Sequence, residues 1–148
     1  MGDFLNKIIS ITLVFLLLVV APLVITYASN DMVAKRLVLN EMTQFIDLVT
    51  DKASVSDSDI DSLYVGVNAS GGVYNVEVKR YVRLATVGED GSIENTYMAD
   101  ELVGTLNVGD VVKVSVSEVG VSTTKRLLWT ILKLDNGNFE PSLAGTVR

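Results

Sequence analysis

Residues 8–28 form a run of 21 residues that contains no charged side chain. At about 1.5 Å of rise per residue, a helix of this length spans about 30 Å, the thickness of the hydrocarbon core of a bilayer. A run this long and this apolar is not typical of an ordinary cytosolic globular protein. The segment therefore has three interpretations: a transmembrane helix retained in lipid, a secretory signal that is cleaved off, or a helix buried in the core of a soluble protein.

The residues on either side of the run distinguish these three interpretations. A secretory signal usually has an apolar region of about 7–15 residues after a basic segment. Here the run is longer and is preceded by Asp3 and Lys7, although Thr26-Tyr27-Ala28 fits a cleavage site. Because the helical pattern continues past Ala28, we expect a retained transmembrane helix rather than a cleaved signal or a buried core helix.

The continuation has the spacing of an amphipathic helix. Its apolar positions follow the i, i+4, i+7, i+8, i+11 pattern of one helix face: Val38, Met42, Phe45, Ile46 and Val49. The sequence therefore predicts one rod from about Phe4 to Asp51, and a division into residues 1–52 and a head of residues 53–148. The acidic, strand-rich head favours an N-terminus inside the cell and a head outside it, although the flanking charges discriminate little.

Pro22 lies in the middle of the apolar run. Proline has no backbone N–H, and its ring clashes with the carbonyl four residues earlier, which is that of Leu18. We therefore expect the rod to bend or open locally here. Two interpretations remain open: a proline that the transmembrane helix tolerates without a functional consequence, as most such helices do, and a hinge that lets the rod bend or unwind when subunits pack.

The head begins with a second helical signal. Ser56 and Asp59 have the spacing of a capping box, and Gly71-Gly72 ends the helix. Its predicted apolar face consists of Ile60, Leu63, Tyr64 and Val67. The triplet Asp57-x-Asp59-x-Asp61 is better explained by this capped helix than by a calcium loop, which needs Gly at its sixth position and Glu at its twelfth.

Alternation of apolar and polar residues then predicts antiparallel strands. Expected strands cover 73–87, 92–98, 112–116 and 142–148, and residues 99–106 are expected to form a short helical turn or an irregular loop. The segment 122–134 is ambiguous, with a broad apolar face that suits a helix on the sheet or at the membrane surface. The predicted fold class is α+β: a long N-terminal transmembrane and amphipathic helix followed by a small antiparallel sheet.

Composition argues against most chemistry. The chain has no Cys and no His, and its net charge is −6. Thiol nucleophiles, imidazole bases and the usual zinc and haem ligands are thereby excluded, and no basic stripe is available for nucleic acid. Nucleotide-binding glycine motifs are also missing from the sequence. We expect a protein that is not an enzyme and that has no catalytic residue, cofactor or metal site.

The layout resembles the type IV pilin superfamily, and in particular the small TadE-like proteins found beside tight-adherence pilus and secretion components of Gram-positive bacteria. The resemblance is carried by the apolar helix with Pro22, by Phe45-Ile46-Asp47 and by the segments 56–62 and 69–78. It extends through residues 109–116, Thr124, Arg126-Leu127 and the final Gly145-Thr146-Val147-Arg148. It implies a pilin-like fold and a structural role in an assembly at the cell surface.

One position departs from the pilin pattern. Pilins have Glu at the fifth position after the glycine of their cleavage site, whereas counting from Asp3 after Gly2 the fifth residue here is Lys7. The departure favours a minor or accessory subunit over a major filament subunit.

The sequence thus predicts a non-enzymatic, single-pass membrane protein whose partners are the lipid bilayer and other pilin-like or secretion-assembly subunits, including copies of itself. The alternative is a membrane-tethered extracytoplasmic binding domain that does not polymerise. The residues expected to pack helices in the assembly are Leu13, Leu17, Pro22, Val38, Met42, Phe45 and Val49.

Overall fold

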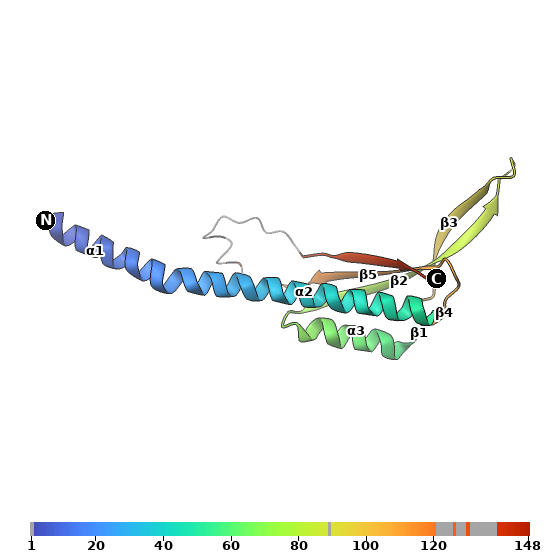
Figure 1. Ribbon diagram of the computed structural model, residues 1–148, viewed down its shortest axis with the longest axis horizontal. Helices are drawn as coiled ribbons and strands as arrows, with labels where there is room; N and C mark the ends of the chain where they lie inside the picture. The colour runs from blue at the N-terminus through green and yellow to red at the C-terminus, as the bar shows by residue number, and fades with distance from the viewer. Residues whose placement is uncertain (1, 89, 121–125, 127–129, 131–138) are drawn as a thin grey trace.

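The N-terminal third of the protein is one helical rod (Figure 1). The computed structural model describes residues 2–88, 90–120, 126, 130 and 139–148. Helix α1 (Gly2–Phe15), the π-helical turn η1 (Leu16–Val20) and helix α2 (Ala21–Lys52) follow one another directly. The predicted rod is therefore confirmed. It ends where Ala53 adopts a left-handed conformation with φ of 50°, which turns the chain back toward the head.

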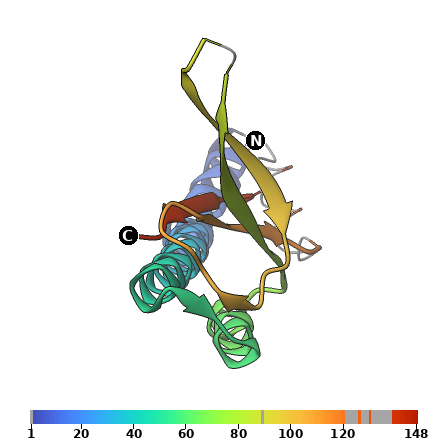
Figure 2. The ribbon, with the colours of Figure 1, turned by 90° about the vertical axis from the view of Figure 1, so that its right-hand side faces the viewer.

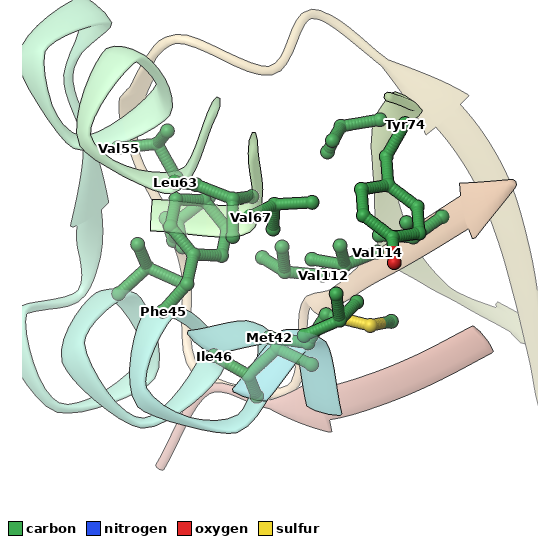
Figure 3. Close-up of a cluster of buried hydrophobic side chains, with 14 of the residues drawn as sticks. Met42, Phe45, Ile46, Val55, Leu63, Val67, Tyr74, Val112 and Val114 are labelled. Atoms are coloured by element: carbon green, nitrogen blue, oxygen red, sulfur yellow. The ribbon is translucent and has the colours of Figure 1, made fainter. Parts of the chain in front are cut away.

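The second half of α2 packs against the head through the predicted apolar stripe. All five stripe residues are buried. They meet a core built from the strands and from helix α3 (Figure 3), whose main members are Val55, Leu63, Val67, Tyr74, Val76, Val112, Val114 and Val116. At about 25 cal/mol per Å² of buried apolar surface, this contact is the main stabilising term available to a head of this size.

Helix α3 (Asp57–Ala69) lies beside α2 and begins at the predicted cap, with Ser56 as N-cap residue and a capping box to Asp59. One carboxylate oxygen of Asp59 accepts hydrogen bonds from the Ser56 N–H at 2.9 Å, the Ser56 hydroxyl at 2.6 Å and the Lys52 ammonium at 2.9 Å. The Ser56 side chain, then Lys52 and the Ser56 N–H, lower the pKa of Asp59 to about 2. This cluster joins the end of the rod to the start of α3.

In the part of the chain that the structure describes, the main sheet has four strands: β2 (Tyr74–Val87), β3 (Ile93–Asp100), β5 (Val111–Glu118) and β6 (Ser142–Thr146). Their order is β3-β2-β5-β6, and every neighbouring pair is antiparallel. Strand β2 changes partner along its length. Its first half, Tyr74–Tyr81, pairs with β5, and its second half, Arg80–Val87, pairs with β3. The predicted α+β class and the predicted edge strand near the C-terminal end are confirmed.

The prediction for residues 99–106 was wrong in part. Strand β3 continues to Asp100, and β4 (Gly104–Thr105) pairs with β1 (Ser54–Val55) in a separate two-stranded antiparallel sheet. Leu106 also donates its N–H to the carbonyl of Ala53 at 2.9 Å. A two-residue strand is too short to show alternation, so its partner cannot be found locally. The ambiguous segment 122–134 and the turn after it lie outside the described residues, except for Arg126 and Thr130.

A buried ion pair fixes the point where β2 changes partner. The Asp110 side chain accepts hydrogen bonds from Arg80 Nη2 at 2.8 Å and Nε at 3.2 Å, and from the Asn107 N–H at 3.0 Å. Its other oxygen accepts from the Arg83 N–H at 3.4 Å. The carboxylate therefore joins β2 to the turn that precedes β5.

Burial by itself raises the pKa of Asp110, but hydrogen bonds from Asn107, Arg80 and Arg83 outweigh it, and the net pKa is lowered. A carboxyl whose pKa is lower in the folded state contributes stability above its unfolded pKa of about 4, and this contribution is lost as the pH falls through the folded value.

We predict that Asp110→Asn lowers the free energy of unfolding by about 3–5 kcal/mol, because it leaves the Arg80 charge buried without a counter-charge. Denaturant unfolding of the full chain in detergent micelles at pH 7 measures this. Asp47→Asn, which alters an exposed carboxylate on α2, serves as the control and changes little. The difference in free energy of unfolding between the two variants becomes smaller as the pH falls below about 4. Equal free energies of unfolding at pH 7 would contradict the role assigned to Asp110.

The contact between the rod and β6 depends on a glycine. A Cβ atom added at Gly145 would overlap Cγ2 of Ile46 and lie 3.2 Å from Cγ2 of Thr50, both on α2. The sheet can therefore lie close to the rod here because Gly145 has no side chain.

We predict that Gly145→Val lowers the free energy of unfolding by about 1–3 kcal/mol, the usual cost of overpacking. Ala144→Val, one residue away and exposed, is the matched control and has little effect. Urea unfolding followed by circular dichroism compares the two, and an unchanged midpoint for Gly145→Val would show that the rod and β6 are not in close contact.

Candidate functional site: the free segment of the rod

The first 36 described residues of the rod, residues 2–37, include no buried side chain, and we call them the free segment. Figure 1 shows this part of the helix extending well beyond the sheet. Its exposed apolar side chains include Phe4, Leu5, Ile11, Leu13, Phe15, Leu17, Leu18, Leu23, Ile25 and Met32. The rod is long and apolar enough to span a membrane, and none of its most apolar window is buried in the described structure, unlike the core helix of a soluble protein.

Two of the predicted packing residues, Leu13 and Leu17, lie one turn apart on the free segment and are 56% and 59% exposed. They line a shallow apolar groove that also includes Ile8, Ile9, Thr12 and Leu16. The Thr12 hydroxyl donates to the Ile8 carbonyl at 2.9 Å, so its polar group is satisfied within the helix. This face can therefore enter an apolar medium at low cost.

Pro22, the third predicted packing residue, follows the π-helical turn directly. The Ala21 N–H donates to the carbonyl of Leu16, five residues earlier, instead of the usual four. Since Pro22 has no N–H to continue the α-helical pattern, the widened turn is the local opening that the sequence predicts. A π turn holds about one extra residue, which rotates α1 by about 100° relative to a regular helix. The turn therefore sets which face of α1 is aligned with which face of α2.

The other four predicted packing residues are placed differently. Val38, Met42, Phe45 and Val49 lie in the core of this chain's own head, where each is at most 5% exposed. They pack the rod against the head within one molecule. Of the predicted set, Leu13, Leu17 and Pro22 are the residues whose side chains are exposed and open to another molecule.

The character of the rod surface changes where the head begins. Asp31 and Lys35 form an i, i+4 ion pair at 2.8 Å, and the Lys35 ammonium lies 5.6 Å from the centre of the Phe139 ring. On the N-terminal side of this ion pair, Tyr27 and Asn30 border a cleft of mixed polar and apolar lining against the 70–74 and 118–120 segments of the head. Tyrosine is enriched at the boundary between lipid and water. The apolar part of the rod therefore ends at the base of the head.

Within the described residues, no group of three or more His, Cys, Asp or Glu side chains is placed to hold a metal ion. The carboxylates with lowered pKa that lie within the folded contacts of the head, Asp59 and Asp110, are engaged with Lys52 and Arg80 respectively. What the described structure offers to a partner is mainly apolar helix surface.

Comparisons of the chain with family models, with curated proteins and with solved structures find no match.

We predict that Pro22→Ala closes the π turn, because the new N–H allows regular α-helical bonding. In the full chain in micelles, amide hydrogen exchange of residues 17–22 should slow at least several-fold. Pro141→Ala, which replaces the other proline of the chain, should leave exchange in the rod unchanged. Identical exchange in Pro22→Ala and the wild type would mean that proline does not cause the wide turn.

Proposed function

We propose that this chain is a non-enzymatic, single-pass membrane protein of the pilin-like class, acting as a minor or accessory subunit of a type IV or tight-adherence pilus or of a related secretion assembly. In this proposal the free segment of the rod lies in the membrane or among neighbouring rods, and the acidic head lies outside the cell.

The observation that carries the proposal is the unpartnered apolar surface of the free segment. From Phe4 to Val33 the helix is about 45 Å long at 1.5 Å per residue, and its large apolar side chains are exposed around the whole circumference. Patches of this size on a soluble monomer mark an interaction surface. Lipid and the apolar surfaces of other helices are the two surroundings that cover all sides of a rod.

The difference between the two halves of the rod also supports a pilin-like subunit. The C-terminal half packs on the head through its buried stripe, and the N-terminal half is exposed and free for contacts outside the chain. Such a layout allows subunits to pack side by side through their rods while their heads form an outer surface. It is the layout on which the resemblance to pilins rests.

Lys7 supports the choice of a minor or accessory subunit. A pilin-type filament uses a Glu at this position to contact the N-terminal amine of a neighbour, and Lys7 would instead repel that amine. This chain is therefore better suited to an assembly whose register is set by other contacts.

The alternative, a tethered head that does not assemble, is favoured by the bulky surface of the free segment. Its Leu, Ile and Val side chains include no GxxxG motif that would let two helices approach closely. The two functions differ in whether rods from different copies touch, and this can be measured.

We predict that Leu13→Cys and Leu17→Cys form disulfide-linked adducts between rods in native membranes that contain the assembly machinery. The wild-type chain has no Cys, so each variant carries one thiol. Val49→Cys is the matched control, because it lies on the same rod but is fully buried in the head, and it should form few adducts. Oxidation followed by non-reducing electrophoresis measures all three.

Adducts at rod positions support assembly. A complete lack of adducts at Leu13 and Leu17, with the protein still in the membrane, supports the tether. Recovery of the protein from the soluble fraction, or a mature chain that begins after Ala28, contradicts the membrane anchor in both cases.

A further inference from the structure

The end of the head nearest to the N-terminus carries an exposed apolar pair, Val73 and Val119. These two residues lie opposite each other, one position beyond the pair of Tyr74 and Glu118, and the Val119 N–H donates to the Val73 carbonyl at 2.8 Å. Val73 is 65% exposed and Val119 is 52% exposed. Figure 1 shows that β2 begins and β5 ends at this end of the head. We call residues 70–73 and 119–120 the basal loops.

The basal loops are held in place by the elements beside them. The Asn68 side chain, near the end of α3, accepts a hydrogen bond from the Tyr74 N–H at 3.2 Å and donates one to the Tyr64 carbonyl at 2.8 Å. This side chain joins the end of α3 to the start of β2, and the backbone bond between Val119 and Val73 joins the start of β2 to the end of β5. The apolar pair therefore has a fixed place relative to the rod.

The basal loops lie beside the rod at the point where it leaves the proposed membrane span. They border a cleft whose other wall includes Tyr27, Asn30 and Ala34 of α2. When residues 8–28 cross the hydrocarbon, the lipid headgroups add a layer of about 5–8 Å on each side, which covers about three to five further residues of a helix. That layer surrounds the rod at about residues 29–33. The basal loops are therefore level with the headgroups.

The outer face of the sheet, which is turned away from the rod, becomes apolar only at this level. Alternate residues of a strand share a face, so the next pair on the face of Val73 and Val119 is Asn75 with Ser117. Glu140 is level with that pair, because its neighbours Phe139 and Pro141 bond to Glu118 and Val116. Exposed charge on this face thus begins about 7 Å farther from the proposed membrane than the apolar pair.

The basal loops themselves contain no charged residue. Two carboxylates line the cleft beside them, those of Asp31 and Glu118. Asp31 is paired with Lys35 at 2.8 Å, and Glu118 also has an interaction within the chain. An uncharged, partly apolar surface suits the layer of lipid headgroups, where amphipathic groups are accommodated.

We propose that the basal loops form a second membrane contact of the protein: Val73 and Val119 enter the lipid headgroup layer beside the point where the rod emerges. The rod alone fixes one axis, and a second contact beside it also fixes the tilt of the head over the membrane. This inference rests on the proposed function, because it requires the free segment to cross a bilayer.

The test measures how close each position comes to lipid headgroups. Val73→Cys, Val119→Cys and Val108→Cys are made singly in the full chain, which has no other thiol. Each is labelled with the fluorophore NBD and reconstituted in phosphatidylcholine vesicles that contain lipids with a nitroxide quencher on the headgroup. We expect quenching at Val73→Cys and Val119→Cys to be several-fold stronger than at Val108→Cys.

Val108 is the matched control because it is 75% exposed but precedes β5, whereas Val119 follows it. The eight residues of β5 separate the two positions by about 27 Å at 3.4 Å per residue. Figure 2 views the molecule from the end where β5 begins, with the N-terminus behind the head.

A second variant separates true contact from mere closeness to the rod. Val119→Glu adds a charge that is costly to remove from water, so it should lower the headgroup quenching of a label at Val73→Cys several-fold. Val108→Glu in the same labelled chain should leave that quenching unchanged. If Val119→Glu also leaves it unchanged, the apolar pair does not hold the head to the lipid and the proposal is overturned.

A label at Leu17→Cys on the free segment separates failure of this inference from failure of the proposed function. With quenchers on the lipid acyl chains, Leu17→Cys should be strongly quenched. Strong quenching there, together with equal headgroup quenching at Val73→Cys, Val119→Cys and Val108→Cys, overturns the second contact and leaves the membrane anchor intact. Absence of quenching at Leu17→Cys overturns both.

Discussion

The contact between one stripe of the rod and the valines of β5 organises the molecule. Val38, Met42 and Val49 are fully buried, as are Val112 and Val114 on the strand that they cover. Within the described residues, α2 and α3 cover the inner face of the sheet, and the second half of the rod is held by the sheet and by α3. Val38 is the first residue of this stripe along the chain. The boundary between the free segment of the rod and the part that packs on the head therefore lies at Val38.

The parts of the fold that could be predicted from the sequence are those with a local physical signature. The rod follows from the helical spacing of apolar residues, the start of α3 from Ser56 and Asp59, and β5 from strict alternation. The exposed positions Leu13 and Leu17 follow from the apolar run in the same way. Burial of Val38 and its stripe in the head could not be separated from burial between subunits, since both use an amphipathic face.

Long-range pairing could not be predicted. Nothing local shows that Ser54–Val55 pairs with Gly104–Thr105, or that β2 leaves β5 for β3 near Arg80. The buried ion pair of Arg80 and Asp110 is only weakly indicated by the sequence. Arg80 falls at an inward position of an alternating strand, and Asp110 lies in the turn before β5. Recognising that the two belong together requires the register of strands 30 residues apart.

The lengthwise placement of α2 along β5 and β6 has a mechanical consequence. A pulling force that acts along the rod, such as extraction from a membrane, is parallel to the strands beside it. The force then acts in shear across the whole row of buried stripe contacts at once, instead of separating them one after another from an end. The head is thereby attached to the rod in the orientation that best resists axial tension.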